Sequence, residues 1–597
     1  MKLKKKIKKS SNYNKLPIWD LKDFYIDIND NQIFKDINDI KNKSKNFQKK
    51  YEGNVKNLSS KKLLTAIVQL EKIDEKKAKI LSYAYLLYAA NIEDKKNKIF
   101  LQKIQEKITT LNSLIIFFNL ELNLIPINKI NKHLNSKILK KYKNWIKISL
   151  SYKSHQLEKN LERLIQEKKI TSSFSWSRLF DETIANLRFN FEKKELSFTE
   201  ISKYLTDKNH IKRKNASLVI GEVLKKNINI FTTISNVLAK DKDIDDKWRN
   251  FKEPISSRNL SNVVEDRVID ALTFSVKKYY PKISHRYYSL KARWFNKKQI
   301  IYWDRNAPLP FQQNKKYSWN DAKSIVLKAY KSFSPEMHAI AEKFFEKKWI
   351  DAQIRKGKQG GAFSASTIPS IHPYILINYQ GTLRDVSTLA HELGHGIHQY
   401  LASFQGYYNA STPLTLAETA SVFGEMLTFK YLLNNEENKL RKKILLANKV
   451  EDMINTVVRQ IAFLEFEKKL HNKRKTSELS TEEICNLWID VQSDSLGPYV
   501  KIKDNYKYYW SYIPHFIHSP FYVYAYAFGD CMVNSLYSVY EKSPKGFEKK
   551  YLQLLKSGGS RNYRELLDTF NFNPTKIKFW SNGLDVISKF IDELENI

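Results

Sequence analysis

The amino-acid sequence predicts a mainly helical protein, and three observations support this fold class. Glycine and proline are scarce, with 16 and 15 residues in a chain of 597, so few positions interrupt long helices. Apolar residues recur three and four positions apart over most of the chain, which is typical of helices that bury one face. Hydrophobic residues make up 42% of the sequence, which argues against disorder. We therefore expect a large core between helices.

From about residue 21 to residue 133 the spacing predicts amphipathic helices that pack in antiparallel pairs. A representative apolar stripe consists of Leu63, Ile67, Leu70 and Ile73. The helical pattern continues to Phe191 and breaks at Lys193–Glu195. This break predicts a boundary between an N-terminal helical region, 1–195, and a second region, 196–597.

The composition of the sequence changes after the helical pattern of residues 199–356. Residues 358–369 are rich in small side chains, and residues 372–379, His-Pro-Tyr-Ile-Leu-Ile-Asn-Tyr, are the best strand candidate in the chain. The dipeptide Gln380-Gly381 ends this predicted strand. Its free edge could pair with an extended peptide backbone, and a structural hairpin is the alternative that these residues leave open.

The segment after this strand contains the pattern His-Glu-x-x-His, at His391, Glu392 and His395. Thr382 and Asp385 form a capping box, so we expect a helix to begin directly after Thr382. The spacing of four puts both imidazoles on one face, where they can share one Zn²⁺, with Glu392 beside them to hold a water. With twelve histidines in the chain, chance gives an expected count on the order of 0.01 for such a match.

Two further features of this predicted helix concern its surroundings. Gly394 and Gly396 weaken it by about 1 kcal/mol each relative to alanine, so we expect close packing there against a neighbour or a ligand. His398 lies three residues beyond His395. Because one turn of helix cannot aim three imidazoles at one tetrahedral site, we expect His398 to support the site or to lie in the core.

A catalytic zinc site needs a third protein ligand and one position open for water. The helix predicted for residues 414–427 carries Glu418, Ser421 and Glu425 on one face with apolar neighbours. Two carboxylates in such surroundings are costly to bury unless they bind a metal or form hydrogen bonds. Glu418 is therefore the predicted third ligand, and Glu425 is predicted to orient a histidine. An exposed charged face is the alternative.

Residues 506–529 are unusually rich in tyrosine and include His515 and His518. So many hydroxyl groups are hard to satisfy in a core, which favours the wall of a cleft. A tyrosine hydroxyl or an imidazole there could stabilise the tetrahedral intermediate of a hydrolysis. Ordinary packing between helices is the alternative. Pro520 predicts the start of a helix.

Composition argues against several other classes of protein. The formal net charge is +39, but lysine is spread along the whole chain and no nucleic-acid-binding signature accompanies it. The two cysteines, Cys485 and Cys531, provide no disulfide framework. Residues 1–10 are basic but lack the apolar stretch of a secretory signal, and no run reaches the roughly 18 apolar residues of a membrane span. We expect a cytoplasmic protein with no nucleic-acid or membrane partner.

Taken together, these segments resemble the thimet oligopeptidase and oligoendopeptidase F family of zinc peptidases. The segments that carry the resemblance are His391–His395, Glu418–Ser421 and residues 515–526. Resemblance to the oligoendopeptidase F branch is seen in Trp176–Glu182, His372–Gln380 and Pro520–Tyr524. The resemblance extends from about residue 176 to the C-terminus. His518 departs from it, since an aromatic or small residue is expected there.

The resemblance implies a nearly all-helical fold of two lobes around a deep substrate channel, with a small β-sheet beside the zinc-binding helix. The edge of that sheet would receive the substrate. The resemblance also implies one Zn²⁺ per chain, short peptide substrates and a set of site residues. Zinc would be bound by His391, His395 and Glu418, Glu392 would be the general base, and His515 with Tyr522 or Tyr524 would contact the substrate or intermediate.

We therefore expect a cytoplasmic zinc endopeptidase that acts on short peptides as a monomer. Two alternatives remain from the sequence. One is a peptide-binding relative that carries the metal site without turnover. The other is a basic nucleic-acid-binding protein, suggested by charge alone.

Overall fold

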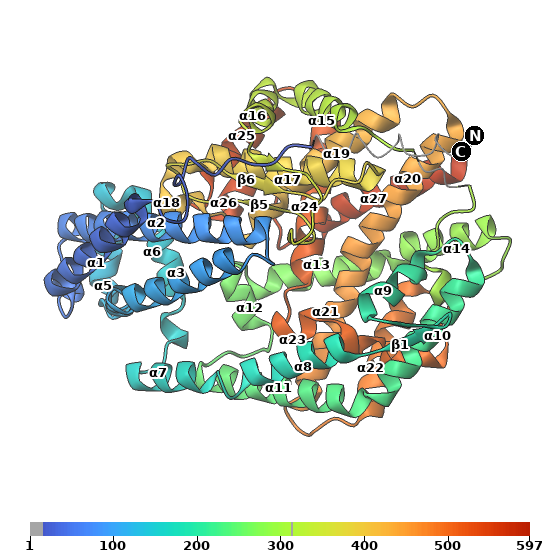
Figure 1. Ribbon diagram of the computed structural model, residues 1–597, viewed down its shortest axis with the longest axis horizontal. Helices are drawn as coiled ribbons and strands as arrows, with labels where there is room; N and C mark the ends of the chain where they lie inside the picture. Colours follow the sequence, from blue (N-terminus) through green and yellow to red (C-terminus); the bar gives the residue numbers. More distant parts are fainter. Residues whose placement is uncertain (1–15, 312–314) are drawn as a thin grey trace, which may run out of the picture. The chain divides into compact units, whose positions relative to one another are not determined.

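The computed structural model describes residues 16–311 and 315–597. The basic residues 1–10, which the sequence distinguishes from a secretory signal, lie outside the described residues. Helices make up most of the described chain, with a few short strands, so the predicted mainly α fold is confirmed (Figure 1). Within these residues, the search for a helix long and apolar enough to span a membrane finds none.

The contacts divide the chain into two compact units, each built from three segments. The first unit comprises residues 1–153, 314–435 and 540–571, and the second comprises residues 154–313, 436–539 and 572–597. The boundary predicted at residue 195 does not coincide with any position at which the chain passes from one unit to the other. It falls instead on a hairpin of the second unit, and it stays a prediction.

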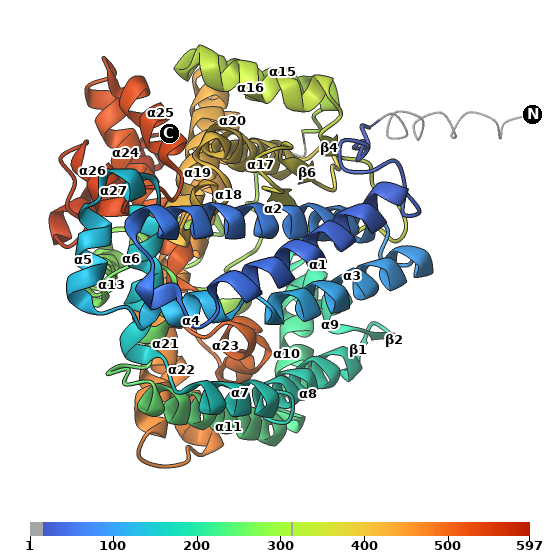
Figure 2. The same ribbon diagram turned by 90° about the vertical axis from the view of Figure 1, so that its left-hand side faces the viewer.

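Long helices form most of the first unit. α1 (Asn31–Tyr51), α2 (Ser60–Ala90) and α3 (Lys95–Ser113) lie side by side, as Figure 2 shows. The predicted apolar stripe of α2 is buried. The other α-helices of this unit are α4 (Phe117–Asn123), α5 (Ile127–Asn135), α6 (Lys143–Ser151), α15 (Trp319–Phe333), α16 (Pro335–Glu346), α17 (Leu383–Ala402), α18 (Tyr407–Ala410), α19 (Leu414–Asn434), α25 (Phe547–Ser557) and α26 (Tyr563–Asp568).

A three-stranded sheet of the first unit lies against α17 (Figure 1). Its strands are β4 (Ile350–Asp351), β5 (Phe363–Ala365) and β6 (Tyr374–Leu376), in the order β4-β6-β5. β6 confirms the predicted strand, but it is central, parallel to β4 and antiparallel to β5. The prediction that its own edge is free is therefore wrong, because both edges are paired. The hairpin alternative describes the β5-β6 pair.

The two outer strands of this sheet differ in their surroundings. On the side of β4, the N–H of Ala352 donates to the carbonyl of Pro17 at 2.8 Å, and the N–H of Asp20 donates to the carbonyl of Lys348 at 3.1 Å. The chain's first described residues therefore cover that side of the sheet. β5 has β6 as its one neighbour in the sheet, which makes it the edge strand.

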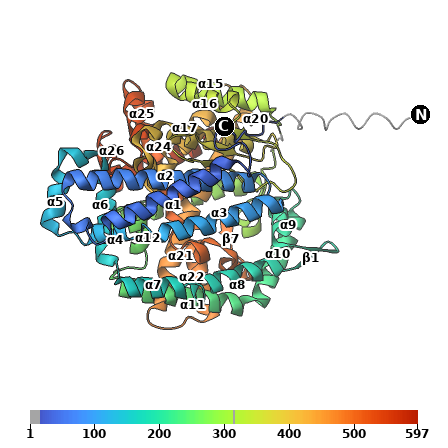
Figure 3. The ribbon, with the colours of Figure 1, turned by 60° about the vertical axis from the view of Figure 1, so that its left-hand side comes forward.

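The second unit is also helical. It contains α7 (Lys159–Lys168), α8 (Ser173–Asn186), α9 (Phe198–Ser202), α10 (His210–Lys226), α11 (Ile228–Trp248), α12 (Ser256–Ser261), α13 (Asp266–Tyr279), α14 (Ser284–Trp294), α20 (Lys439–Met453), α21 (Arg459–Arg474), α22 (Thr481–Leu496), α23 (His515–His518), α24 (Tyr524–Lys542), which ends just past the unit, and α27 (Ile577–Asn596). α8 packs along α11, as Figure 3 shows.

Short strands in the second unit were not expected from the sequence. β3 (Ile300–Ile301) pairs in parallel with β7 (Val500–Lys501). β1 (Phe189–Phe191) and β2 (Lys194–Leu196) form an antiparallel hairpin. Its turn contains Glu192 and Lys193, with φ angles of 48° and 63°. The break in the apolar pattern near residue 195 is therefore a tight β-turn.

A π-helical turn, Ile454–Val458, lies between α20 and α21. One prediction about a helix in this unit is wrong. Pro520 does not begin a helix, because Phe521 has a φ of 61°, and α24 begins at Tyr524. A residue with positive φ cannot lie inside a right-handed helix.

Candidate metal centre

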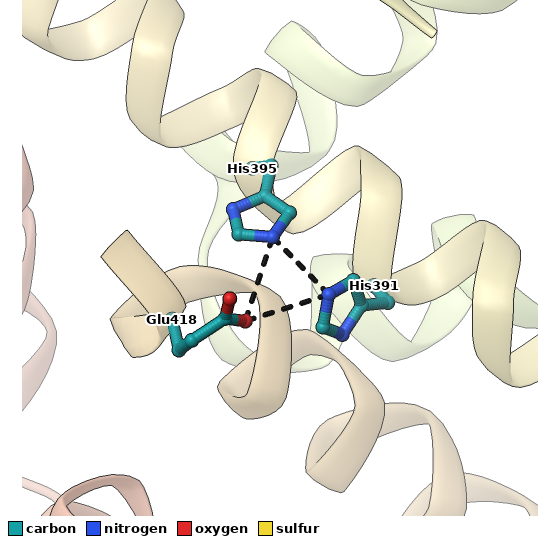
Figure 4. A group of neighbouring side chains, drawn as sticks. All are labelled: His391, His395 and Glu418. Atoms are coloured by element: carbon teal, nitrogen blue, oxygen red, sulfur yellow. Dashed lines mark hydrogen bonds and ion pairs between the residues drawn. The ribbon is translucent and has the colours of Figure 1, made fainter. Parts of the chain in front are cut away.

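Helix α17 places two imidazoles one turn apart, as its sequence predicts. Thr382 caps the helix with the expected capping box, and the Nε2 atoms of His391 and His395 lie 3.1 Å apart. The Oε2 atom of Glu418, from α19, lies 3.4 Å from the Nε2 of His391 and 3.5 Å from that of His395. Figure 4 shows Glu418 pointing toward both rings. One donor atom from each residue thus lies within 4.8 Å of the other two.

The close approach of α17 and α19 depends on glycine. A Cβ atom on Gly394 would lie 2.3 Å from the carbonyl oxygen of Ala420, in the backbone of α19. A Cβ atom on Gly424 would lie 2.0 Å from the hydroxyl of Tyr330, which in turn donates to the carbonyl of Ala390 at 2.8 Å. The predicted close packing at Gly394 is confirmed. It lets Glu418 reach the histidines from a second helix.

Hydrogen bonds behind two of the three donors, His391 and Glu418, fix their orientation. The Oε1 atom of Glu425 lies 2.6 Å from the Nδ1 of His391, which confirms the predicted contact and leaves the Nε2 of that ring directed at the cluster. Ser387 donates to the other oxygen of Glu425 at 3.1 Å. Ser421 donates to the Oε2 of Glu418 at 2.7 Å. His391 and Glu418 are therefore each held by a partner on α19.

The charges of the cluster shift the pKa values of its members. Burial lowers the pKa of His391, but the hydrogen bond to Glu425 and the charges of Glu425 and Glu418 outweigh it and raise the pKa to about 9. Burial raises the pKa of Glu392 to about 7, against the opposing charge of His391. Burial also lowers the pKa of His395. Because metal ligands must be deprotonated, metal binding at His391 competes with its protonation.

A cavity of about 320 Å³ opens beside this cluster. His391, Glu392 and His395 line it from α17, and Phe363 and Ser364 line it from β5. The site and the edge strand of the sheet therefore share one cavity. β5 was not predicted from the sequence, because its short run Phe-Ser-Ala carries no periodic signal.

Two more side chains of α17 line the same cavity. Gln399 is bonded to β5, because its Nε2 donates to the carbonyl of Ser364 at 3.2 Å and its Oε1 accepts from the Ser364 hydroxyl at 2.9 Å. The spacing of four from His395 could have placed Gln399 on this face. His398 is buried, and it is not among the three clustered donors of the described residues, as predicted.

The predicted substrate-contacting residues lie in the second unit. His515 begins α23, is half-buried, and has its Nε2 atom 3.3 Å from the hydroxyl of Tyr526. Tyr522 is half-buried as well, with the Arg258 guanidinium 5.9 Å from its ring centre. Tyr524 is 1% exposed, and its hydroxyl accepts from the Nδ2 of Asn262 at 2.7 Å. Tyr526 was not among the site residues predicted from the sequence.

Comparison with known proteins identifies the family. The model described as peptidase family M3 matches residues 204–586, which is more than half of the chain. The chain belongs to peptidase family M3. A second model, described as oligopeptidase F, matches residues 121–189, so the chain is an M3 metallopeptidase of the oligopeptidase F type.

Relatives of this M3 peptidase match it over nearly its full length. An oligoendopeptidase F homolog from Borreliella burgdorferi is 28% identical and covers 97% of this chain and 98% of its own. Oligopeptidase PepF from Bacillus subtilis is 26% identical and covers 92% of this chain and 82% of its own.

Solved structures share the fold. A putative peptidase from Chlamydophila abortus superposes with a TM-score of 0.85 at 25% identity, over 97% of this chain and 98% of its own. Oligoendopeptidase-F from Enterococcus faecium superposes with a TM-score of 0.71 at 20% identity, over 95% and 98% of the two chains.

Proposed function

We propose that this M3 peptidase is a zinc endopeptidase that hydrolyses short peptides, with one Zn²⁺ per chain held by His391, His395 and Glu418. The single observation that supports this most is the convergence of two imidazole nitrogens and one carboxylate oxygen within 4.8 Å of one another. This donor set is typical of catalytic zinc sites, which keep a further position for water. The residues present therefore fit the metal.

Glu392 is the proposed general base. A bound zinc ion would act as a Lewis acid toward the scissile carbonyl and would lower the pKa of a water molecule. Glu392 lies next to His391 on α17, lines the same cavity and is 6% exposed. From there it would accept a proton from the attacking water and deliver it to the leaving amine.

The edge of β5 is the proposed binding site for the peptide backbone. β5 lines the cavity beside the three donors, and its outer edge has no strand partner among the described residues. Main-chain hydrogen bonds to a strand edge bind a peptide with little dependence on its side chains. Gln399 would restrict how far along β5 the peptide reaches, because it already bonds to Ser364.

His515, Tyr522 and Tyr524 remain the proposed contacts to the substrate or intermediate. His515 and Tyr522 are partly exposed, which supports this role for them. Tyr524 would have to give up its hydrogen bond to Asn262. Tyr526 joins the proposed set, since its hydroxyl lies beside His515.

The test uses a quenched fluorescent peptide of about eight residues, long enough for several contacts along a strand edge. We expect wild-type protein containing one zinc to cleave it, and a chelator to abolish cleavage until zinc is restored. Glu392→Gln should keep its zinc, measured by mass spectrometry of the metal, and should lose about 10²- to 10⁴-fold in kcat. His391→Ala should lose both zinc and activity.

Glu336→Gln is the matched control, because it makes the same chemical change at an exposed residue that pairs with Lys556. It should leave turnover unchanged. Cleavage that survives both Glu392→Gln and chelation would disprove the zinc-hydrolase mechanism. A wild-type protein that holds one zinc and binds the peptide without cleaving it would support the peptide-binding alternative.

The cellular setting is proposed from composition alone. The scarcity of cysteine agrees with a reducing cytoplasm. The proposal includes short peptides as partners, a monomeric enzyme, and no nucleic-acid or membrane partner.

A further inference from the structure

The turn between α23 and α24 in the second unit, Ser519–Val523, contains a residue in an uncommon conformation. Phe521 has a φ of 61°, a left-handed value that bulky side chains rarely adopt. Its side chain is fully buried, at 0% exposed. Such a conformation persists only where the surrounding structure holds it.

Two contacts from other helices hold this turn. The N–H of Phe521 donates to the Oε1 of Glu467, on α21, at 2.8 Å. The Nε of Arg258, on α12, donates to the carbonyl of Pro520 at 3.0 Å. The ring of His471 lies 4.8 Å from the ring of Phe521. The backbone on the N-terminal side of Phe521 is thus held by two side chains from outside the turn: Glu467 accepts a hydrogen bond from it and Arg258 donates one to it.

Glu467 is an unusual residue to find at this position. It is 2% exposed, and its Oε2 atom has no hydrogen-bond partner within the part of the chain that the structure describes. It lines a cavity of about 30 Å³ together with Pro520 and Phe516, a volume large enough to hold a water. Burial raises the pKa of Glu467 to about 8, although the Phe521 N–H and the charge of Arg258 oppose this. A buried acid is costly to keep for packing alone.

The residues on either side of the turn are the proposed substrate contacts. His515 lies in the short helix before the turn, and Tyr522 directly follows Phe521. Tyr526 lies in the first turn of α24, with its hydroxyl beside the His515 ring. The path of the turn therefore determines how these three side chains are oriented relative to one another.

We infer that Glu467 and Arg258 are positioning residues, which fix the Ser519–Val523 turn and through it the orientation of His515, Tyr522 and Tyr526, the proposed substrate contacts. The inference rests on the proposed function, because it assigns these residues a role in the same peptide hydrolysis. Neither Glu467 nor Arg258 touches the reacting atoms.

The test compares two substitutions of Glu467 with a matched control. Glu467→Gln keeps the size and the acceptor for the Phe521 N–H, whereas Glu467→Leu keeps the size and removes the acceptor. Gln492→Leu is the control, because Gln492 is buried in the same unit and accepts from the Tyr506 hydroxyl at 2.9 Å. We expect kcat/KM to fall about tenfold or more in Glu467→Leu. It should stay within about twofold in Glu467→Gln and Gln492→Leu, which leave the turn intact.

Hydrogen exchange of the full-length protein reports on the turn without any need for turnover. Amides of residues 519–526 should exchange faster in Glu467→Leu than in wild type, Glu467→Gln or Gln492→Leu. If Glu467→Leu does not fold, Arg258→Met gives the same comparison, because it removes the donor to Pro520.

Turnover and hydrogen exchange together distinguish a failure of this inference from a failure of the proposed function. If wild type cleaves no peptide, the proposed function fails and the exchange rates alone decide whether Glu467 holds the turn. Unchanged exchange in Glu467→Leu, or an equal loss of kcat/KM in Glu467→Leu and Gln492→Leu, would overturn the inference.

Discussion

Glu425 lies outside the cluster of three donors but contacts one of them. Its carboxylate lies 2.6 Å from the Nδ1 of His391, so it fixes the tautomer and the orientation of that ring. We expect Glu425→Ala to weaken zinc binding about 10- to 100-fold. Competition for zinc with a chromogenic chelator measures this change directly.

Ser387→Ala serves as the control for this prediction. It removes the hydroxyl that donates to the far oxygen of Glu425 at 3.1 Å and leaves the contact to His391 in place. A much smaller loss of zinc affinity is expected. Wild-type affinity in Glu425→Ala would show that the contact has no role in binding the metal.

Glu467 should make the stability of the protein depend on pH in a recognisable direction. Burial is the main cause that raises its pKa from the ordinary glutamate value of 4.5 to about 8. A group with a raised folded pKa stabilises the fold fully below its unfolded pKa, and this contribution is lost as the pH rises through the folded pKa. The free energy of unfolding of wild type relative to Glu467→Gln should therefore fall between about pH 4.5 and pH 8, by up to about 1.4 kcal/mol per pH unit.

Urea denaturation of both proteins across this range measures the difference. The comparison with Glu467→Gln is necessary because other titratable or charged groups surround the site, namely His471, Lys242 and Arg258. Burial lowers the pKa of His471 to about 3, so its own effect has the opposite sign and cancels between the two proteins. A difference that does not vary with pH would contradict the raised pKa of Glu467.

At the scale of the element, the site depends on how closely α17 and α19 cross. A Cβ atom on Gly394 would lie 2.3 Å from the backbone oxygen of Ala420 and 2.6 Å from the Cα of Ser421. Both are backbone atoms of α19, so neither can move away unless the whole helix shifts. We expect Gly394→Ala to lower the free energy of unfolding by about 1–3 kcal/mol and to weaken zinc binding, because Glu418 moves with α19.

Thermal unfolding and zinc content of purified Gly394→Ala check this prediction. Gly360→Ala is the matched control, since a Cβ atom there would meet no atom within 4 Å, and its effect should stay within about 0.5 kcal/mol. A Gly394→Ala protein with wild-type stability and zinc content would mean that α17 and α19 can move apart without loss of stability or of zinc binding.

The sequence predicted long elements better than short ones. α17 has a capping box and α19 is a long apolar run; both begin where they were predicted to begin, and α19 continues to Asn434, beyond the predicted end at residue 427. β5 has three residues, which is too short for any period to be visible. The interruption at Ile454–Val458 leaves the apolar spacing on both sides intact and so gives no signal.

At the scale of the whole molecule, each unit is assembled from three separate segments of chain. In the first unit, Trp145 stacks on Tyr408 at 4.7 Å. Asn144 donates to the carbonyl of Gly559 at 2.7 Å. Residues before 154 are therefore part of the same core as the metal centre and the C-terminal helices of that unit.

Expression of residues 196–597 alone tests the predicted domain boundary against this assembly. We expect the fragment to lack cooperative thermal unfolding, because it exposes the apolar surface that residues 1–153 cover. Addition of a separate fragment of residues 1–195 should restore cooperative unfolding and zinc binding. Cooperative unfolding of 196–597 by itself, followed by circular dichroism, would support the boundary at residue 195.

The sequence by itself determined the features that depend on near neighbours along the chain. These are the cap at Thr382, the spacing of His391 and His395, and the shared face of Glu418 and Glu425. A helix repeats every 3.6 residues, so such relations can be read from one segment. They were sufficient to predict that His391, His395 and Glu418 come together and that Glu425 contacts His391.

Only the tertiary structure decided which strand edges and side chains remain free to bind a ligand and which are used in contacts within the fold. It paired both edges of β6 and left β5 at the edge of the sheet. It buried Tyr524 against Asn262, and it placed Glu467 beneath the turn at Phe521. Each of these contacts joins residues more than ten positions apart or in different elements. The free energy of such contacts depends on packing and desolvation in the folded core, which no local pattern records.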